Sequence, residues 1–154
     1  VETITVMLGA NADLIQSSIS DTAIKIIVHN EWKEGMGSTI RFGLNTLTSI
    51  YPQTEAVIFM VADQPFTTAE LLDQLLDVHR TNGSKIVAAK YLDTFGTPVL
   101  FHKTFFPELL QLKGDVGAKS LVRKYLNETA FVPFPKGQID IDTIDDYNNL
   151  SKEH

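Results

Sequence analysis

Two acidic segments that each follow an apolar run carry the side chains with the clearest potential for chemistry. Val-Ala-Asp-Gln-Pro occupies residues 61–65, and Asp-Ile-Asp-Thr occupies residues 140–143. In an α/β sheet such positions fall at the carboxyl ends of strands, where ligands bind. Carboxylates at two such ends can share one ion, and Mg²⁺ is usually held by one or two carboxylates together with substrate phosphates. The pattern favours Mg²⁺ chemistry on a phosphate.

Each acidic segment also has a structural explanation. An Asp before Gln-Pro can end a strand or cap the next helix, because Asp accepts backbone N–H bonds and Pro suits the first turn of a helix. This alternative stays open for Asp63. Asp140 and Asp142 alternate along an expected strand, which points both to one face, and two like charges there repel unless a cation or a donor lies between them.

A glycine-containing loop at residues 29–37 precedes a helix expected to begin at Ser38. Gly35, Gly37 and Ser38 lie at this junction, where backbone N–H groups and the positive end of the helix can receive an anion or a base edge. The same residues also suit a tight turn capped by Ser38. Asn30 could hydrogen-bond a base, and Arg41 could pair with a phosphate or with a surface carboxylate.

Strand and helix patterns alternate along nearly the whole chain. Strands are expected at residues 3–8, 23–28, 56–62, 85–89, 99–101 and 130–134, and helices at 14–19, 38–50, 69–79, 105–112, 119–126 and 144–150. This alternation predicts an α/β protein with a mostly parallel, doubly wound sheet. No repeat or linker interrupts it, so residues 1–154 are expected to form a single domain.

Composition narrows the function classes. The chain has 13 basic and 19 acidic residues, a balance that disfavours nucleic acid and anionic membranes as partners. It contains no cysteine, which excludes disulfides, thiolate catalysis and Cys-rich zinc sites, and its four histidines show no ligand spacing. Because no run of about 18 apolar residues and no signal-peptide pattern is present, a cytoplasmic protein is expected.

Six short motifs occur in a definite order. They are Leu-Gly-Ala-Asn-Ala at 8–12, the segment Asn-Glu-Trp-Lys-Glu-Gly-Met-Gly-Ser at 30–38, Ala-Asp-Gln-Pro at 62–65, Gly-Thr-Pro-Val-Leu-Phe at 96–101, Gly-Asp-Val-Gly-Ala at 114–118 and Asp-Ile-Asp-Thr at 140–143. Together they resemble the MobA-like nucleotidyltransferases, and within them the molybdenum cofactor cytidylyltransferases. The resemblance extends to about Leu150.

This resemblance implies transfer of a nucleotide from a nucleoside triphosphate, CTP before GTP, to the phosphate of molybdopterin with release of pyrophosphate. Such a reaction uses Mg²⁺ to neutralise charge between two anionic groups. The resemblance makes Asp63 the central ligand and Asp142 the second, with Asp140 still open. It assigns the nucleotide to Asn30, Gly35, Gly37 and Ser38, and the pterin side to Gly96, Pro98, Gly114, Asp115 and Gly117.

One part of the family pattern has no counterpart in the chain. The Gly-rich phosphate loop, with its Arg and Lys, is missing, so we expect a Rossmann-like sheet of the nucleotide-diphospho-sugar transferase type without its first β-α unit, and a fragment that is inactive alone. Two alternatives stay open. They are transfer to another phosphorylated acceptor such as a sugar phosphate, and a non-catalytic binding or insertion chaperone for the molybdenum cofactor. A molybdoenzyme or its chaperone is a further candidate partner.

Overall fold

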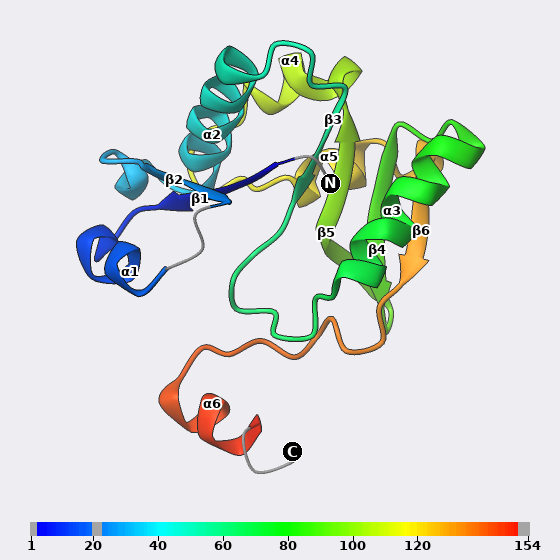
Figure 1. Ribbon diagram of the computed structural model, residues 1–154. Helices are drawn as coiled ribbons and strands as arrows, with labels where there is room; N and C mark the ends of the chain where they lie inside the picture. Colours follow the sequence, from blue (N-terminus) through cyan, green and yellow to red (C-terminus); the bar gives the residue numbers. More distant parts are fainter. Residues whose placement is uncertain (1–2, 20–22, 151–154) are drawn as a thin grey trace. The chain divides into compact units, whose positions relative to one another are not determined.

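The computed structural model of the protein describes residues 3–19 and 23–150, and strands alternate with helices along these ranges (Figure 1). The predicted α/β class is confirmed. The chain divides into two compact units, of which the first comprises Val1–Glu55 and Lys103–Lys124 and the second Ala56–His102 and Tyr125–His154. Each unit contains its own sheet.

The first unit contains two parallel strands, β1 (Ile4–Leu8) and β2 (Ile24–Val28), paired in register from Ile4 with Ile24 to Leu8 with Val28. Helix α1 (Ala12–Ser18) lies on the connection between them, as a parallel pair requires. The other elements of this unit are η1 (Trp32–Glu34), α2 (Met36–Ile50), η2 (Lys103–Phe105), α4 (Phe106–Leu109) and α5 (Lys119–Lys124). Ile40 and Leu44, one turn apart on α2, are buried.

The second unit contains four strands in the spatial order β3 (Ala56–Phe59), β5 (Thr94–His102), β4 (Ile86–Tyr91) and β6 (Thr129–Pro133) (Figure 1). Strand β5 is antiparallel to β3 and β4, while β6 is parallel to β4. Hence β3, β4 and β6 run in one direction, as predicted for a mostly parallel sheet. Only Leu92 and Asp93 separate β4 from β5, and so short a connection can join antiparallel strands only.

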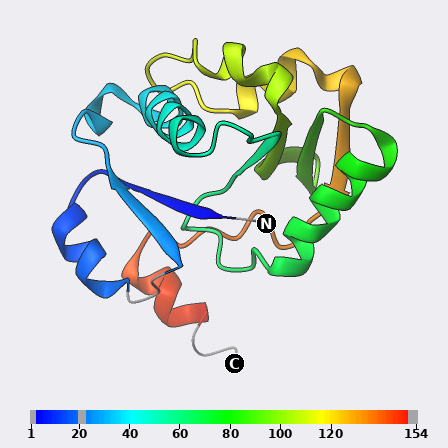
Figure 2. The same ribbon diagram turned by 45° about the horizontal axis from the view of Figure 1, so that its top comes forward.

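Helix α3 (Ala69–Asn82) covers one face of this four-stranded sheet (Figure 2). Its apolar stripe buries Leu71 and Leu75 against the sheet. Thr68 caps its start as expected, since Thr68 Oγ1 accepts a hydrogen bond from the Leu71 N–H at 3.3 Å. The central strands are apolar on both faces, and residues 86–89 have no exposed surface. The remaining elements of this unit are the 3₁₀ helix η3 (Leu126–Glu128) and the helix α6 (Ile144–Leu150).

Three of the predicted element boundaries are wrong in ways that affect the candidate site. Strand β3 ends at Phe59, so Asp63 lies in a turn rather than at the last position of a strand. Helix α2 begins at Met36 with Gly35 as its N-cap, so Ser38 is not the cap. Residues 140–143 form no strand, and the expected alternation of Asp140 and Asp142 along a strand does not occur.

A helix cap explains the last difference. Thr143 Oγ1 accepts a hydrogen bond from the Asp146 N–H at 3.2 Å, and the Asp146 carboxylate accepts one from the Thr143 N–H at 2.8 Å. This reciprocal pattern is a capping box for α6. It fixes Thr143 in the cap of the helix, so the segment around it does not form a strand. Among the helices of the described residues, none has the length and hydropathy that a membrane span needs.

Candidate active site

The structure brings the two predicted acidic segments together within the second unit. Asp63 lies in an exposed turn after β3, and Asp140 and Asp142 lie in an exposed segment before α6. The Ile141 N–H donates a hydrogen bond to the Asp63 carbonyl oxygen at 2.8 Å, so the two segments are joined through their backbones. We call Asp63, Asp140 and Asp142 the acidic group.

The members of the acidic group affect one another electrostatically. Partial burial first, and then the negative charges of Asp63 and Asp142, raise the pKa of Asp140 above its usual value. Like charges this close favour a bound cation or a proton, because either relieves their repulsion. Asp146 has a different role: its hydrogen bonds with Thr143 lower the pKa of its carboxyl, as expected for a cap that is fixed in its charged form.

The acidic group fits an ion that takes part of its coordination from a substrate. No set of three or more His, Asp or Glu side chains is arranged as a ready-made metal site in the described part of the chain. Mg²⁺ does not need one, since it usually binds through one or two carboxylates, substrate phosphates and water. The predicted ligand roles of Asp63, Asp142 and Asp140 agree with this mode of binding and stay predictions.

Gln64 connects the Asp63 turn to two other segments. Its Nε2 donates to the Gly137 carbonyl oxygen at 2.8 Å, and its Oε1 accepts from Thr97 Oγ1 at 3.0 Å. The Gly96-Thr97-Pro98 segment therefore lies beside the acidic turn. At Gly96 the close approach is made by the chain itself, because a Cβ there would collide with the Tyr91 hydroxyl. Pro98 is fully buried and shapes the segment from within.

Two glycine loops of the first unit contact each other, namely the loop at residues 29–37 and the Gly-Asp-Val-Gly-Ala segment at residues 114–118. The Gly37 N–H donates to the Gly114 carbonyl oxygen at 2.8 Å. A Cβ on Gly35, whose φ is 100°, would lie 2.6 Å from Asp115 Oδ1, and a Cβ on Gly37 would lie 2.8 Å from the Lys113 nitrogen. These glycines therefore permit one backbone to pack directly against another. Gly117 is less constrained, since Met36 Cγ lies 3.5 Å from its Cβ position.

The expected backbone donors at the start of α2 are mostly used within the chain. Gly35 N–H bonds to the Trp32 carbonyl at 3.1 Å, Ser38 N–H bonds to the Gly35 carbonyl at 3.1 Å, and Gly37 bonds to Gly114. The interpretation of this junction as a cradle of free N–H groups is therefore wrong for these three donors.

The side chain of Ser38 points into the protein rather than toward a ligand. Its Oγ lies 2.9 Å from His29 Nε2, and the two residues are only 3% and 4% exposed. The His29 ring stacks on Phe42 with a centroid distance of 4.6 Å. Sequence reasoning missed His29, although a histidine that ends an apolar strand was a visible signal. The buried hydrogen bond between Ser38 and His29 therefore supports the loop at residues 29–37.

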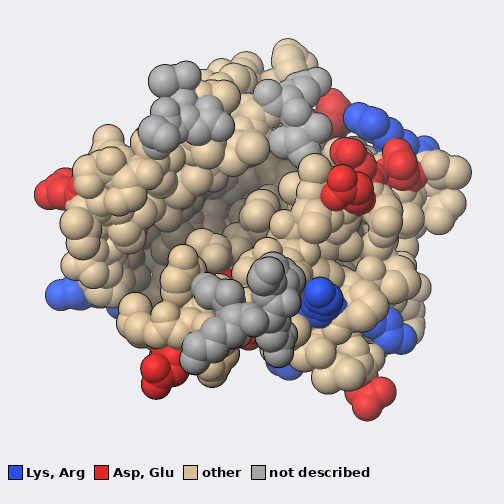
Figure 3. Space-filling view, turned by 60° about the horizontal axis from the view of Figure 1, so that its bottom comes forward, with Lys and Arg blue, Asp and Glu red and all other residues tan. Residues whose placement is uncertain are grey.

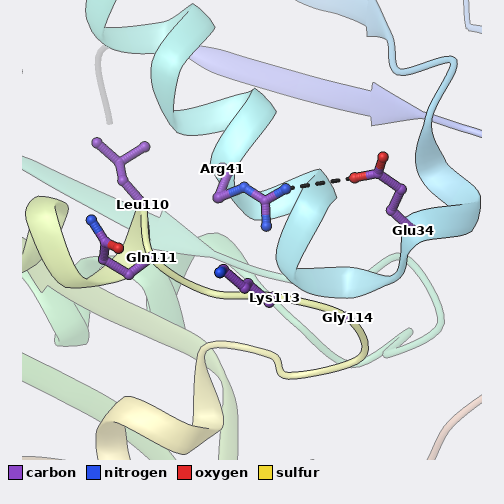
Figure 4. Close-up of a pocket in the computed structure, with 6 residues that line it drawn as sticks. All are labelled: Glu34, Arg41, Leu110, Gln111, Lys113 and Gly114. Atoms are coloured by element: carbon purple, nitrogen blue, oxygen red, sulfur yellow. Dashed lines mark ion pairs between the residues drawn. The ribbon is translucent and has the colours of Figure 1, made fainter.

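Arg41 stabilises the same region (Figure 4). Its guanidinium donates to the Leu112 carbonyl oxygen and lies 3.6 Å from the Glu34 carboxylate. The predicted contact with a surface carboxylate is present, and the alternative contact with a phosphate stays a prediction. Arg41 borders a depression of about 410 Å³ whose other lining residues are Glu34, Leu110, Gln111, Lys113 and Gly114.

Asn30 lies in a second depression of the first unit, at the carboxyl ends of β1 and β2. This depression has a volume of about 480 Å³ and is lined by Gly9, Asn11, Ala12, Asp13, Leu14, Val28, Asn30 and Trp32. Trp32 packs over Gly9, where a Cβ would lie 2.8 Å from the Trp32 side chain. The carboxyl ends of parallel strands are the usual place for a ligand in this class of fold. Asn30 is exposed there.

The comparison with protein families decides the relationship. Residues 1–129 match the model of the MobA-like NTP transferase domain. The chain belongs to this family. The MobA-like match includes Asp63 and both glycine loops but ends before Asp140 and Asp142. Their assignment rests on the Asp-Ile-Asp-Thr motif and is supported by their electrostatic effect on one another and from Asp63.

Known relatives of this MobA-like chain are distant. It is 27% identical over 123 residues to purine catabolism protein PucB from Bacillus subtilis (strain 168), covering 78% of the chain and 58% of PucB. It is 24% identical over 127 residues to nicotine blue oxidoreductase from Paenarthrobacter nicotinovorans, covering 79% and 60%. The chain thus spans less than two thirds of either relative.

A solved structure shares the fold. The crystal structure of the Mycobacterium tuberculosis rv0371c homologue from Mycobacterium sp. strain JC1 is 25% identical, with a TM-score of 0.80, and the match covers 99% of this chain and 75% of the other. In the space-filling view, acidic and basic side chains are interspersed on the face shown, among the residues drawn in colour (Figure 3).

Proposed function

We propose that the protein is a Mg²⁺-dependent nucleotidyltransferase that moves a nucleotide from a nucleoside triphosphate to a phosphate group and releases pyrophosphate. The observation that carries this proposal is the acidic group, in which Asp63, inside the MobA-like match, is bonded through its backbone to Ile141 between Asp140 and Asp142. Membership of an NTP transferase family supplies the reaction class to which such carboxylates are suited.

In this proposal Asp63 and Asp142 hold the ion, and Asp140 is the alternative to Asp142 as the second ligand. When bound, Mg²⁺ would neutralise charge between the two anionic reactants and polarise the phosphoryl oxygens. The Ile141–Asp63 bond holds the two carboxylate segments beside each other before any ligand arrives. This prior arrangement reduces the reorganisation that metal binding would otherwise require.

The nucleotide side of the proposal centres on Asn30, because its side chain is exposed in a depression at the ends of two parallel strands. Gly35, Gly37 and Ser38 contribute the shape of the neighbouring loop instead of a set of free donors. Gly96, Gly114, Asp115 and Gly117 are proposed for the acceptor side on the family resemblance, with Pro98 as a buried support.

The proposed acceptor is the phosphate of molybdopterin, and the proposed donor is CTP, with GTP as the alternative. Both assignments rest on the order of the six sequence motifs. The names of the two curated relatives refer to purine catabolism and to nicotine blue, and neither specifies a nucleotide acceptor. A sugar phosphate or another phosphorylated acceptor is therefore the comparison that a substrate screen must include.

Pyrophosphate release tests the proposed function directly. We expect release with CTP or GTP and molybdopterin, dependent on Mg²⁺ and abolished by EDTA. Asp63→Asn should reduce it by orders of magnitude, because loss of a metal ligand costs several kcal/mol of transition-state stabilisation. Asp73→Asn is the matched control, since Asp73 is an exposed residue of α3.

The assay should use residues 1–154 and, in parallel, the same chain with a strand and a Gly-rich phosphate loop joined ahead of it. We expect residues 1–154 alone to bind CTP weakly and to transfer no nucleotide, because such a loop would carry most of the negative charge of the triphosphate. Wild-type turnover by Asp63→Asn would refute the metal assignment. Cofactor binding without pyrophosphate release from any donor would favour the chaperone alternative.

A further inference from the structure

One buried amide joins three separate segments of the second unit. Gln64 is 7% exposed, and both ends of its amide are used, by Gly137 and by Thr97. A buried amide whose donor and acceptor are both satisfied has one orientation that is strongly preferred, because turning it would leave polar atoms unpaired. Gln64 therefore fixes the turn that contains its neighbour Asp63.

Tyr91 lies beside the same amide. Gln64 lowers the pKa of the Tyr91 hydroxyl against the larger opposing effect of burial, and the Tyr91 ring meets Phe134 edge-on with a centroid distance of 6.3 Å. The ring fits between two glycines, because a Cβ on Gly96 or on Gly137 would collide with it. Burial first, and then the charge of Asp140, raise the pKa of Tyr91, so the phenol lies within electrostatic range of the acidic group.

These contacts lead directly to the second acidic segment. Gly137, which accepts from Gln64, lies three residues before Asp140 in the sequence. The Ile141 N–H then bonds to the carbonyl of Asp63, the residue before Gln64. The Asp63–Gln64 turn is thus joined to the segment before α6 at two neighbouring points, once through a side chain and once through the backbone.

We propose that Gln64 and Tyr91 are positioning residues that set the spacing between Asp63 and the Asp140–Asp142 segment. They act through the Gly137 carbonyl and the Ile141–Asp63 bond, and neither needs to touch a substrate. The inference concerns metal affinity and rests on the proposed function only where it assigns the ion to these carboxylates. The residues that surround a ligand set commonly change metal affinity by about 10–100-fold when they are removed.

The first experiment measures the position of the segment without any metal. Amide hydrogen exchange at Ile141 reports whether its bond to Asp63 is kept. Gln64→Leu keeps a similar volume and removes both hydrogen bonds, so we expect Ile141 to exchange at least about tenfold faster, while core amides such as Val87 and Leu100 follow global stability alone. Gln74→Leu, on the exposed side of α3, should leave Ile141 unchanged.

Milder variants keep the test valid if Gln64→Leu does not fold. Tyr91→Phe removes only the hydroxyl, and Thr97→Val removes only the donor to Gln64 Oε1. Both should speed exchange at Ile141, and Thr97→Ser, which keeps that donor, should restore slow exchange. Unchanged exchange at Ile141 in the folded variants would overturn the proposal, whatever their activity.

The second experiment uses Mn²⁺ as the probe. Electron paramagnetic resonance should show about tenfold weaker Mn²⁺ binding for Tyr91→Phe or Thr97→Val and wild-type binding for Thr97→Ser and Gln74→Leu. In turnover, excess metal should restore the rate, because the loss lies in affinity. Equal Mn²⁺ affinity in all variants would also overturn the proposal. If wild-type protein keeps Ile141 protected but releases no pyrophosphate, the proposed function fails and the positioning role remains.

Discussion

The buried pair formed by His29 and Ser38 gives a stability prediction whose size follows from the structure. Ser38→Ala removes a hydrogen bond of 2.9 Å between two residues that are 4% and 3% exposed, and it leaves His29 Nε2 without that partner. Leaving a buried polar atom unpaired costs about 1–3 kcal/mol. For a protein of this size that corresponds to a fall in Tm of roughly 2–12 °C, at about 2–4 °C per kcal/mol.

A double-mutant cycle tests this reasoning by urea unfolding. His29→Phe preserves an aromatic ring against Phe42, where the native ring centroids are 4.6 Å apart. Combining it with Ser38→Ala should recover much of the loss, since removing both partners of a hydrogen bond can be nearly neutral. Ser49→Ala, which removes an exposed hydroxyl of α2, is the control and should stay within about 0.5 kcal/mol of wild type. A Ser38→Ala variant as stable as this control would refute the argument.

Three further predictions follow from other contacts. Because the pKa of Asp140 is raised in the folded state, its ionisation opposes folding as pH rises through that pKa. Asp140→Asn should therefore be more stable than wild type at about pH 7 and lose this advantage near pH 3. A stability difference that urea unfolding finds to be the same at both pH values would contradict this. Gly37→Ala places a Cβ 2.8 Å from the Lys113 nitrogen and should cost about 1–3 kcal/mol, measured by thermal unfolding, with a neutral result showing that the loops can separate freely. Thr143→Ala should raise the pKa of Asp146 toward its usual value in an NMR titration, and an unmoved pKa would mean that the cap does not hold the charge.

Sequence patterns predicted most of the elements because their signals are local. Period-3.6 stripes located α2 and α3, and continuous apolar runs located β3 and β4. One error could have been avoided with a signal of the same kind, since Thr143 and Asp146 have the spacing of a capping box. The hairpin between β4 and β5 was not visible in this way, because the predicted strands were too short to show that only two residues separate them.

Other features depend on contacts between distant residues, which no local pattern contains. The start of α2 moved from Ser38 to Met36 because Gly35, at a positive φ, packs against the Gly114–Asp115 loop far along the chain. The Gln64 bond to Gly137 spans 73 residues. The sequence did indicate that Asp63 and the 140–142 segment belong together, and the structure joins them; their ligand roles stay predictions.

The hydrogen bond from Gly37 to Gly114 has a consequence for how substrates are bound. One loop is proposed for the nucleotide and the other for the acceptor, yet this bond and the Arg41 contact with Leu112 join the two loops directly. A ligand that shifts either loop must then change the affinity of the other loop for its own ligand, and the effect is equal in both directions. The nucleotide donor and the phosphate acceptor would therefore bind with a measurable coupling free energy, so that the affinity for each depends on whether the other is bound.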